Sequence, residues 1–212
     1  MKASARLMSP SERDFCAKEI KELLEKGLIE PSKNPWACRD FVVNKHSEIK
    51  RGKPRLVVNY KPLNAFLQKV RYPLPDKASL LQRFAGCTIF SKFDLKSGFY
   101  QIGIEAKDRY KTTFVVPHGQ YQQKVLPFGI NNAPSKFQKM MEDIFRDKKW
   151  ALVFIDDILV CSKNIQYHLK HLYSFYDMVY KHGLVFSQSK MEIGKTEIDF
   201  LGFKIQKGQV IL

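Results

Sequence analysis

The sequence predicts an α+β fold in which helices pack on one face of a mainly antiparallel sheet. Its expected elements run helix, strands, helix, strands, helix, strands, which is neither a regular strand–helix alternation nor strands followed by helices. With 44% hydrophobic and 13% aromatic residues, the 212-residue chain can build a substantial core. Its longest uncharged apolar runs, 151–155 and 158–161, are far shorter than the roughly 20 residues of a membrane span. The composition therefore excludes wholesale disorder and indicates no membrane partner.

The first expected element is a helix that begins at residues 9–12, Ser-Pro-Ser-Glu, a capping box with proline at the first helical position. Apolar residues then recur at helical spacing, and Gly27 suits the helix end. Residues 41–45 and 55–60 are typical of strands, and the segment between them is polar and basic. The first quarter of the chain therefore ends in a basic hairpin.

The middle of the chain is expected to contain a short helix capped by Asp76 and a strand over 87–94 that ends on an aspartate. Residues 111–116 and 121–125 predict a second hairpin, and 132–147 predict a strongly amphipathic helix.

The last third begins with two apolar strands, 150–155 and 158–162, with almost no turn between them. A helix over 164–181 follows and ends near Gly183. Its His168 and His171 lie three apart, but no third ligand is near in sequence, so a packing or surface role is favoured over a metal site. Short strands are expected at the end of the chain, over 184–187, 191–193 and 198–205.

The charge balance points to a polyanionic partner, most often a nucleic acid. Lys and Arg number 36 against 21 Asp and Glu, which gives a net charge of +15, although a solvated lysine-rich surface gives the same figure. The four cysteines are scattered and form no CxxC motif, and the first ten residues lack the apolar segment of a signal peptide. Both features predict an intracellular protein with reduced cysteines.

The sharpest chemical feature is the adjacent pair Asp156 and Asp157, between two strands rich in Val, Ile and Leu. Two carboxylates drawn toward a buried sheet repel each other, and a bound Mg²⁺ would remove that repulsion. Two such ions can clamp the attacking and leaving oxygens of a phosphoryl displacement, and Asp94, at the end of the strand 87–94, is the candidate third ligand. The alternatives are that Asp-Asp is a plain hairpin turn and that Asp94 is a helix cap.

Four segments taken in order carry a family resemblance: FDLKSGFYQI (93–102), VLPFGINNAPSKFQ (125–138), FIDDILV (154–160) and FLGF (200–203). They resemble the reverse transcriptases of gypsy-type retrotransposons and plant pararetroviruses of the caulimovirus family, over roughly residues 10 to 205. The resemblance implies a right-hand polymerase, with a fingers subdomain at 1–68 and 102–132. The palm would take 69–101 and 133–212 and end just after the primer grip, with the thumb, connection and RNase H regions absent.

The resemblance also implies an RNA-directed and DNA-directed DNA polymerase that adds dNTPs to a primer. Asp94 and Asp156 would be the main ligands of two Mg²⁺ ions, with Mn²⁺ as a possible substitute, and Asp157 would support them. Lys190 matches a lysine proposed to protonate the leaving pyrophosphate. Phe154 replaces a common tyrosine and Gln123 a common aromatic residue, and neither change touches the metal ligands.

The remaining site residues carried over by resemblance concern the nucleotide and the primer. Arg55 and, less securely, Lys45 match residues on the incoming triphosphate, although solvated charge on a basic hairpin is the alternative. Phe99 matches the aromatic gate that excludes a ribose 2′-hydroxyl, with ordinary core packing as its alternative, and Phe128 would pack under the nucleotide. The primer grip matches three consecutive residues: Leu201, Gly202 and Phe203.

The expected partners are an RNA or DNA template with a DNA primer, dNTPs, and the missing domains of a longer polyprotein. The expected location is intracellular, in the cytoplasm or a virus-like particle. Two other functions stay open. One is a catalytically weak fragment that binds template–primer without a thumb. The other is another palm-type polymerase, an RNA-dependent RNA polymerase or a group II intron relative, against which PFGINNAP and Phe99 weigh.

Overall fold

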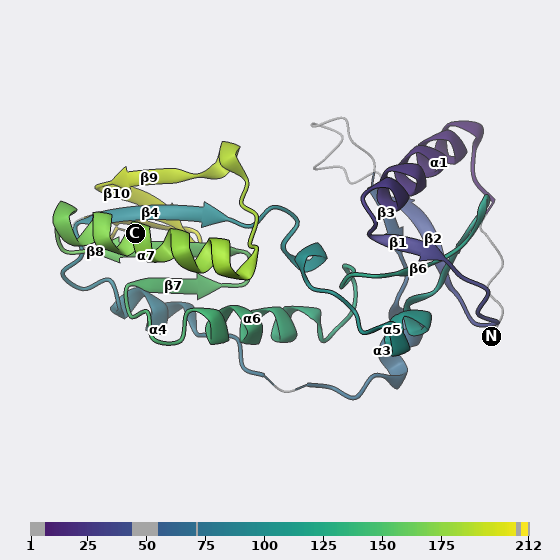
Figure 1. The fold of residues 1–212 in the computed structure, drawn as a ribbon, viewed down its shortest axis with the longest axis horizontal. Coiled ribbons are helices and arrows are strands. Elements are labelled where there is room, and N and C mark those ends of the chain that lie inside the picture. Colours follow the sequence, from purple (N-terminus) through teal and green to yellow (C-terminus); the bar gives the residue numbers. More distant parts are fainter. Residues whose placement is uncertain (1–6, 44–54, 71, 207–208, 212) are drawn as a thin grey trace. The chain divides into compact units, whose positions relative to one another are not determined.

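The structure is a computed structural model that describes residues 7–43, 55–70, 72–206 and 209–211 (Figure 1). The chain divides into two compact units, the first made of Met1–Lys69 and Phe99–Ala133 and the second of Val70–Gly98 and Pro134–Leu212. These divisions lie within three residues of the fingers and palm boundaries expected from the sequence. The names fingers and palm for the two units stay a prediction.

The first unit is built on a five-stranded sheet with the strand order β1-β6-β5-β2-β3. Strands β2 and β5 pair in parallel and the other neighbours are antiparallel, so the two hairpins expected from the sequence are both present. The strands are β1 (Ile29–Pro31), β2 (Cys38–Val43), β3 (Arg55–Val58), β5 (Phe114–Val116) and β6 (Gly119–Gln123).

Helix α1 (Pro10–Glu25) begins with the predicted capping box, in which Ser9 and Glu12 satisfy each other's backbone N–H groups. Its residues Cys16 and Ile20 are buried in one core cluster with the sheet residues Ile29 and Phe114. The unit's other helical segments are short: α3 (Lys61–Phe66), η1 (Gly98–Gln101), α5 (Ala106–Arg109) and η2 (Tyr110–Thr112).

The second unit contains an antiparallel four-stranded sheet with the order β7-β8-β4-β9 and a smaller three-stranded sheet with the order β10-β11-β12. Its strands are β4 (Ile89–Asp94), β7 (Ala151–Phe154), β8 (Asp157–Ser162), β9 (Glu192–Lys195), β10 (Glu197–Phe200), β11 (Phe203–Gln206) and β12 (Gln209–Ile211). Its helices are α4 (Lys77–Gln82), α6 (Ala133–Ile144), α7 (Ile165–His182) and the 3₁₀ turn η3 (Gln188–Lys190). The mixture of helices and mainly antiparallel sheets confirms the predicted α+β class.

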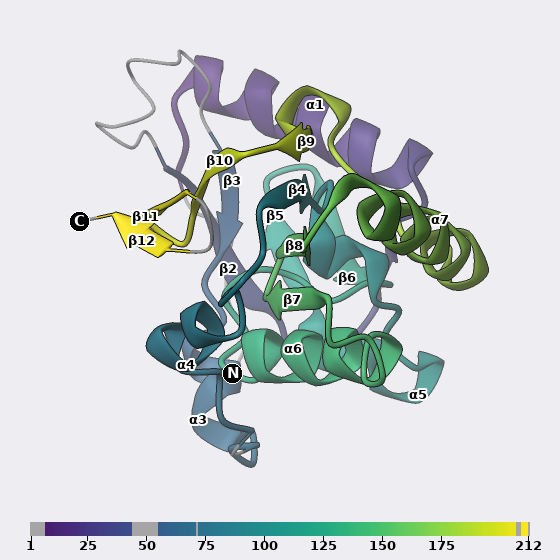
Figure 2. The ribbon, with the colours of Figure 1, turned by 90° about the vertical axis from the view of Figure 1, so that its left-hand side faces the viewer.

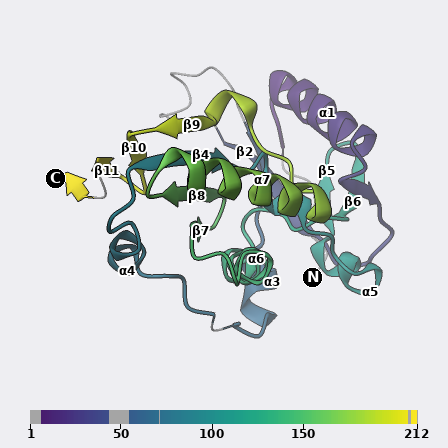
Figure 3. The ribbon, with the colours of Figure 1, turned by 60° about the vertical axis from the view of Figure 1, so that its left-hand side comes forward.

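Side chains of β4 point alternately to the two faces of the large sheet. On one face Phe93 stacks on Phe175 of α7, which lies across β4 and β8 (Figure 3). On the other face Phe90 joins a core cluster with Phe84 and Phe200. Figure 2 shows α7 on one side of the sheet and α4 with β10 and β11 on the other. The sheet is therefore covered on both faces, so functional side chains are expected at the ends of its strands.

The environment of His168 on helix α7 shows which role this histidine has. His168 is buried and contacts two serine hydroxyls, Ser91 through Nε2 at 2.7 Å and Ser162 through Nδ1 at 2.9 Å. Burial lowers the pKa of His168, and the neighbouring His171 lowers it further. His168 is a satisfied core residue, which confirms the packing role expected from the sequence.

Two sequence expectations near the end of the chain are wrong. Residues 184–187 form no strand, because only Phe186 pairs, through an isolated bridge to Leu95. The segment 198–205 is two strands, β10 and β11, separated by a tight turn at residues 201 and 202. Among the described residues, no helix is both long and apolar enough to cross a membrane.

Candidate active site

The three predicted carboxylates lie at the adjoining ends of β4 and the β7–β8 hairpin. Asp94 ends β4 and stands directly opposite Asp157, the first residue of β8. Asp156 precedes Asp157 in the hairpin turn, and its carbonyl accepts a hydrogen bond from Leu95 N at 2.9 Å. Like charges directly opposite each other destabilise a strand pair, so the register itself is costly at this point.

Burial and mutual repulsion shift the acidity of this cluster. The pKa of Asp156 rises from 3.8 to about 6, mainly because the carboxyl is buried and then because Asp94 and Asp157 repel its charge, against the opposing effect of Lys190. Burial and then Asp94 likewise raise the pKa of Asp157. Asp156 Oδ1 is buried and has no hydrogen-bond partner among the described residues. The described lysines therefore compensate the negative charge of the cluster only in part.

Lys190, whose proposed role in protonating pyrophosphate stays a prediction, lies beside this charge. Its Nζ donates to Asp94 Oδ1 at 2.9 Å, while the Asp94 carbonyl accepts from Ser187 N at 2.8 Å. On the neighbouring side, Lys92 is ion-paired with Glu192 and donates to the Asp199 carbonyl at 2.9 Å. Two lysines thus flank the carboxylates, and both are already engaged.

A cavity of about 460 Å³ opens beside the carboxylates in the second unit. Its wall includes Asp94, Asp157 and Lys190, and also Leu201 and Gly202 of the predicted primer grip. Phe203 follows as the first residue of β11, in register with Phe200. The structure therefore brings Asp94 and Asp157, two of the three predicted metal ligands, to one cavity with Lys190 and the turn at residues 201 and 202. Asp156 does not line this cavity.

The backbone is strained around this cavity. In the described part of the chain, three residues other than glycine have positive φ: Ser97 at 52°, Ile155 at 50° and Leu201 at 54°. Ser97 follows the strand of Asp94, Ile155 precedes Asp156, and Leu201 lies on the cavity wall. Such conformations cost energy and cluster at functional sites.

The predicted nucleotide-contacting residues belong to the first unit. The ring of Phe99 meets the ring of Phe128 edge-on with centroids 5.1 Å apart, and Tyr100 contacts the same Phe128 at 5.5 Å. Arg55 begins β3 opposite Val43, but its side chain lies outside the described residues, as does all of Lys45. The structure thus brings Phe99 and Phe128 together and leaves the two triphosphate-binding assignments as predictions.

Sequence reasoning missed two residues at this site, Gly98 and Gln138. Gly98 lies so close to Asp156 that an added Cβ would be 2.9 Å from Asp156 Cγ. Gln138 is completely buried and bonds to the hairpin backbone on both sides of Phe154. A glutamine on the same helix face as the apolar Met141 and Phe145 was the available signal, because a buried amide needs partners.

The three carboxylates have the oxygen ligands that a divalent metal prefers, but their side chains are not arranged around a common metal position. Across the described residues, no group of three or more His, Cys, Asp or Glu side chains is placed to hold a metal ion. However, hard divalent cations bind carboxylate oxygens. Asp156 Oδ1 is buried with no hydrogen-bond partner in the part of the chain that the structure describes, and two carboxyl pKa values are raised. The residues present therefore suit a cation that would offset their repulsion.

Comparison with known proteins gives a consistent result. The family model described as reverse transcriptase (RNA-dependent DNA polymerase) matches residues 43–205. The chain is 47% identical over 208 residues to a genome polyprotein of Petunia vein clearing virus, covering 98% of this chain and 10% of that protein. It is 43% identical over 201 residues to an enzymatic polyprotein of Cauliflower mosaic virus, covering 94% of this chain and 30% of that protein.

A solved structure of the foamy viral protease–reverse transcriptase in complex with an RNA/DNA hybrid shares the fold. It superposes with a TM-score of 0.86 at 21% identity, over 97% of this chain and 27% of that one. The chain thus spans between a tenth and a third of these longer relatives. The predicted resemblance to pararetroviral enzymes is confirmed, and the chain belongs to the reverse transcriptase (RNA-dependent DNA polymerase) family.

Proposed function

We propose that this chain is the fingers and palm of a DNA polymerase that copies RNA and DNA templates by adding dNTPs to a primer 3′ end. The observation that carries the proposal is the placement of Asp94, Asp156 and Asp157 at adjoining strand ends beside Lys190. The match of most of the chain to the reverse transcriptase family supports the same reaction. The first unit would be the fingers and the second the palm.

Asp94 and Asp156 would hold two Mg²⁺ ions, which Mn²⁺ could replace, with Asp157 in support. When bound, such ions lower the pKa of the attacking hydroxyl and stabilise the charge on the transferring phosphate. The protein's own contribution is to hold three carboxylates in a strained, half-buried arrangement whose repulsion favours cation binding. The remaining work is positioning and charge stabilisation.

Lys190 would act as the acid for the leaving pyrophosphate. Its Nζ is ion-paired with Asp94, and the residue lines the cavity. A proton donated to the departing phosphate oxygen would stabilise the developing charge. Arg55 and Lys45 would bind the triphosphate, and Leu201, Gly202 and Phe203 would hold the primer end. These roles rest on the family motifs.

The proposed partners are an RNA or DNA template annealed to a DNA primer, and dNTPs. Foamy virus relatives of the same fold have been solved with an RNA/DNA hybrid and with double-stranded DNA. The relatives are several times longer than this chain, so we propose that a thumb and an RNase H domain act with it in a longer viral polyprotein. Such a protein would work inside the cell, in the cytoplasm or a virus-like particle.

Primer extension tests the proposal directly. On poly(rA) annealed to oligo(dT), the chain with Mg²⁺ and dTTP should lengthen the primer, and chelation of the metal should stop it. Binding should weaken steeply as salt rises, because a net charge of +15 indicates many phosphate contacts. A filter-binding assay run in parallel separates the rival function: template–primer binding without any dTTP incorporation would favour the binding-only fragment.

The gate assignment predicts that Phe99→Val admits ribonucleotides. The Phe99 ring is held edge-on against Phe128, so its removal should open room at a 2′-hydroxyl and raise rNTP incorporation relative to dNTP by about 10-fold to 100-fold. Phe66→Val is the control, since Phe66 lies in the same unit and is 85% exposed. Wild-type protein that used rNTPs as readily as dNTPs would contradict the gate and favour an RNA polymerase.

A further inference from the structure

The turn that carries Asp156 needs an external support. Phe154 and Asp157 pair as the last residue of β7 and the first of β8, so the turn consists of Ile155 and Asp156 alone. Ile155 has φ of 50°, a left-handed conformation that is strongly disfavoured for a β-branched residue. Two-residue hairpin turns normally use Asn or Gly where φ is positive. Neither residue type is present, so the turn is held in place by contacts outside the hairpin.

Gln138 of α6 supplies those contacts. Its side chain is fully buried, and its Oε1 accepts a hydrogen bond from Ile155 N at 2.6 Å. Its Nε2 donates to the Val153 carbonyl at 3.0 Å. One rigid amide therefore fixes the backbone on both sides of Phe154, and the fixed N–H belongs to the residue directly before Asp156. The bond to the Val153 carbonyl is buried and the bond from Ile155 N is partly buried, so the loss of this pair is costly.

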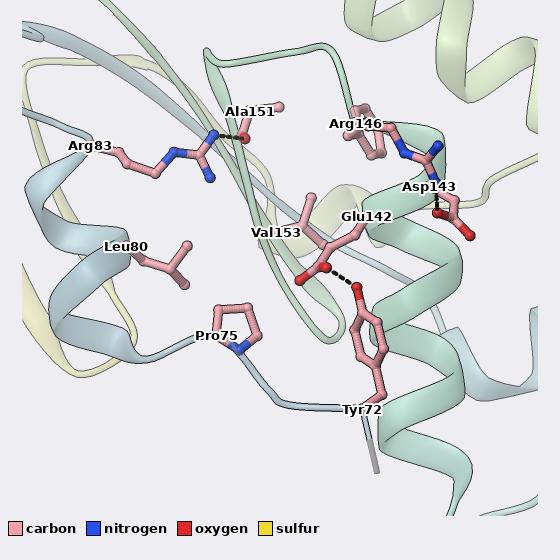
Figure 4. A pocket seen from close by; sticks show the side chains of 10 residues that line it. Tyr72, Pro75, Leu80, Arg83, Glu142, Asp143, Arg146, Ala151 and Val153 are labelled. Atoms are coloured by element: carbon pink, nitrogen blue, oxygen red, sulfur yellow. Dashed lines mark hydrogen bonds and ion pairs between the residues drawn. The ribbon is translucent and has the colours of Figure 1, made fainter. Parts of the chain in front are cut away.

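Glu142, one helical turn further along α6, orients the amide of Gln138. Glu142 Oε1 accepts from Gln138 Nε2 at 2.7 Å, and Oε2 accepts from the Tyr72 hydroxyl. Figure 4 shows the Tyr72 hydroxyl pointing at the Glu142 carboxylate, in a cavity of about 400 Å³ that Val153 also lines. Because a carboxylate only accepts, it holds the NH₂ side of Gln138 toward itself and leaves Oε1 for Ile155.

We propose that Gln138 is a positioning residue for the active-site turn, and that Tyr72 and Glu142 keep it in its working orientation. The inference rests on the proposed polymerase function, since it deepens the role of Asp156. Gln138 is fully buried, and its side chain bonds to Ile155 N, the Val153 carbonyl and Glu142. It acts through the backbone of Ile155, and its loss lets the turn relax toward negative φ and carries the Asp156 carboxylate away from Asp94.

The test combines amide hydrogen exchange with nucleotide incorporation. In Gln138→Met, which keeps the volume but removes both hydrogen bonds, exchange of the 152–158 segment should speed up by about tenfold. The kcat for dNTP addition should fall by about 10-fold to 100-fold, with template–primer binding and the dNTP KM nearly unchanged, because a small misplacement of the reacting groups is enough. Tyr72→Phe should shift both readouts in the same direction by a smaller factor.

A reciprocal exchange distinguishes positioning from simple packing. Gln138→Glu alone places two carboxylates together and should lose the protection of the 152–158 segment. Combining it with Glu142→Gln restores an acceptor for Ile155 N–H and places an amide donor against the new carboxylate, while the Val153 carbonyl stays without its donor, so protection and kcat should return in part. Gln123→Met, the loss of a buried glutamine of the other unit, controls for a general drop in stability and should leave the 152–158 segment unaffected.

Each outcome bears on one of the two proposals. Unchanged exchange of the 152–158 segment in a folded, active Gln138→Met variant overturns the positioning role. If that variant does not fold, unchanged exchange in Tyr72→Phe, together with no rescue when Gln138→Glu and Glu142→Gln are combined, overturns it instead. If the wild-type chain incorporates no dNTP, but the Gln138 variants show the predicted changes in exchange, the polymerase function is contradicted. The support of the turn by Gln138 then still stands.

Discussion

Asp156→Asn is expected to abolish nucleotide incorporation while making the chain more stable at neutral pH. Asp156 is proposed as a main metal ligand, so its loss should lower incorporation by roughly 10³-fold. The gain in stability has a separate cause. The carboxylate is half-buried, faces two other carboxylates and leaves Oδ1 without a partner among the described residues. An asparagine of the same shape removes the charge.

The sign of the pH dependence follows from the raised pKa. The pKa of Asp156 rises from 3.8 to about 6 in the folded chain. The contribution of this carboxyl group to the free energy of unfolding is therefore fully present below pH 3.8 and is lost as the pH rises through about 6. Above that pH the wild-type chain bears the full cost of the buried charge. After allowance for solvent screening at a half-buried site, Asp156→Asn should gain about 1 to 2 kcal/mol there.

Thermal unfolding across this pH range measures the effect. The midpoint of Asp156→Asn should exceed that of the wild type above pH 6, by about 2 to 4 °C per kcal/mol, and the two should converge at low pH. Mg²⁺ should raise the wild-type midpoint and leave that of Asp156→Asn almost unchanged. Asp177→Asn, an exposed carboxylate on α7, is the matched control. A variant that keeps its incorporation, or its response to Mg²⁺, would contradict the ligand assignment.

Local signals made much of the fold predictable from sequence. The capping box at Ser9 and the cap–glycine pair Asn164 and Gly183 mark their helices because both ends satisfy backbone groups with nearby residues. The strand predicted over 184–187 is absent because the segment pairs only past the end of β4, whose last residue is Asp94. In the structure, Phe186 alone pairs with Leu95, and the chain is then tied to Asp94 through Ser187 N.

The carboxylates of the candidate site were predictable because they lie next to each other, or at the end of a predicted strand, in the sequence. Asp156 and Asp157 lie between two apolar strands, and Asp94 ends a third, so a meeting at strand ends could be expected. Gly98 and Gln138 gave no comparable signal. Their roles depend on which backbone they approach, and that depends on how α6 and the segment after β4 pack against the hairpin. Local sequence patterns do not predict such packing between elements that are far apart in the sequence.

Gly98→Ala should inactivate the site by displacing Asp156. An added Cβ would fall inside contact distance of Asp156 Oδ1 and lie 2.9 Å from both Asp156 Cγ and Phe137 Cζ. Phe137 is completely buried and has no room to retreat, so the carboxylate must move. Incorporation should fall by about 100-fold, and overpacking should cost about 1 to 3 kcal/mol of stability. Gly103→Ala is the control, because no atom of the described residues lies within 4 Å of its added Cβ.

A double-mutant cycle assigns this clash to its partner. If the methyl group that Gly98→Ala introduces acts mainly on the Asp156 carboxylate, the stability cost of that substitution should shrink by more than about half in an Asp156→Ala background. Of the three atoms nearest the added Cβ, that background keeps only Phe137 Cζ. A cost that stays the same in both backgrounds would place the clash on Phe137 and the core instead. Full incorporation by Gly98→Ala would mean that Asp156 works from a different position. The glycine matters here for the space it leaves, since that space lets a repelled, half-buried carboxylate lie against the chain that follows Asp94.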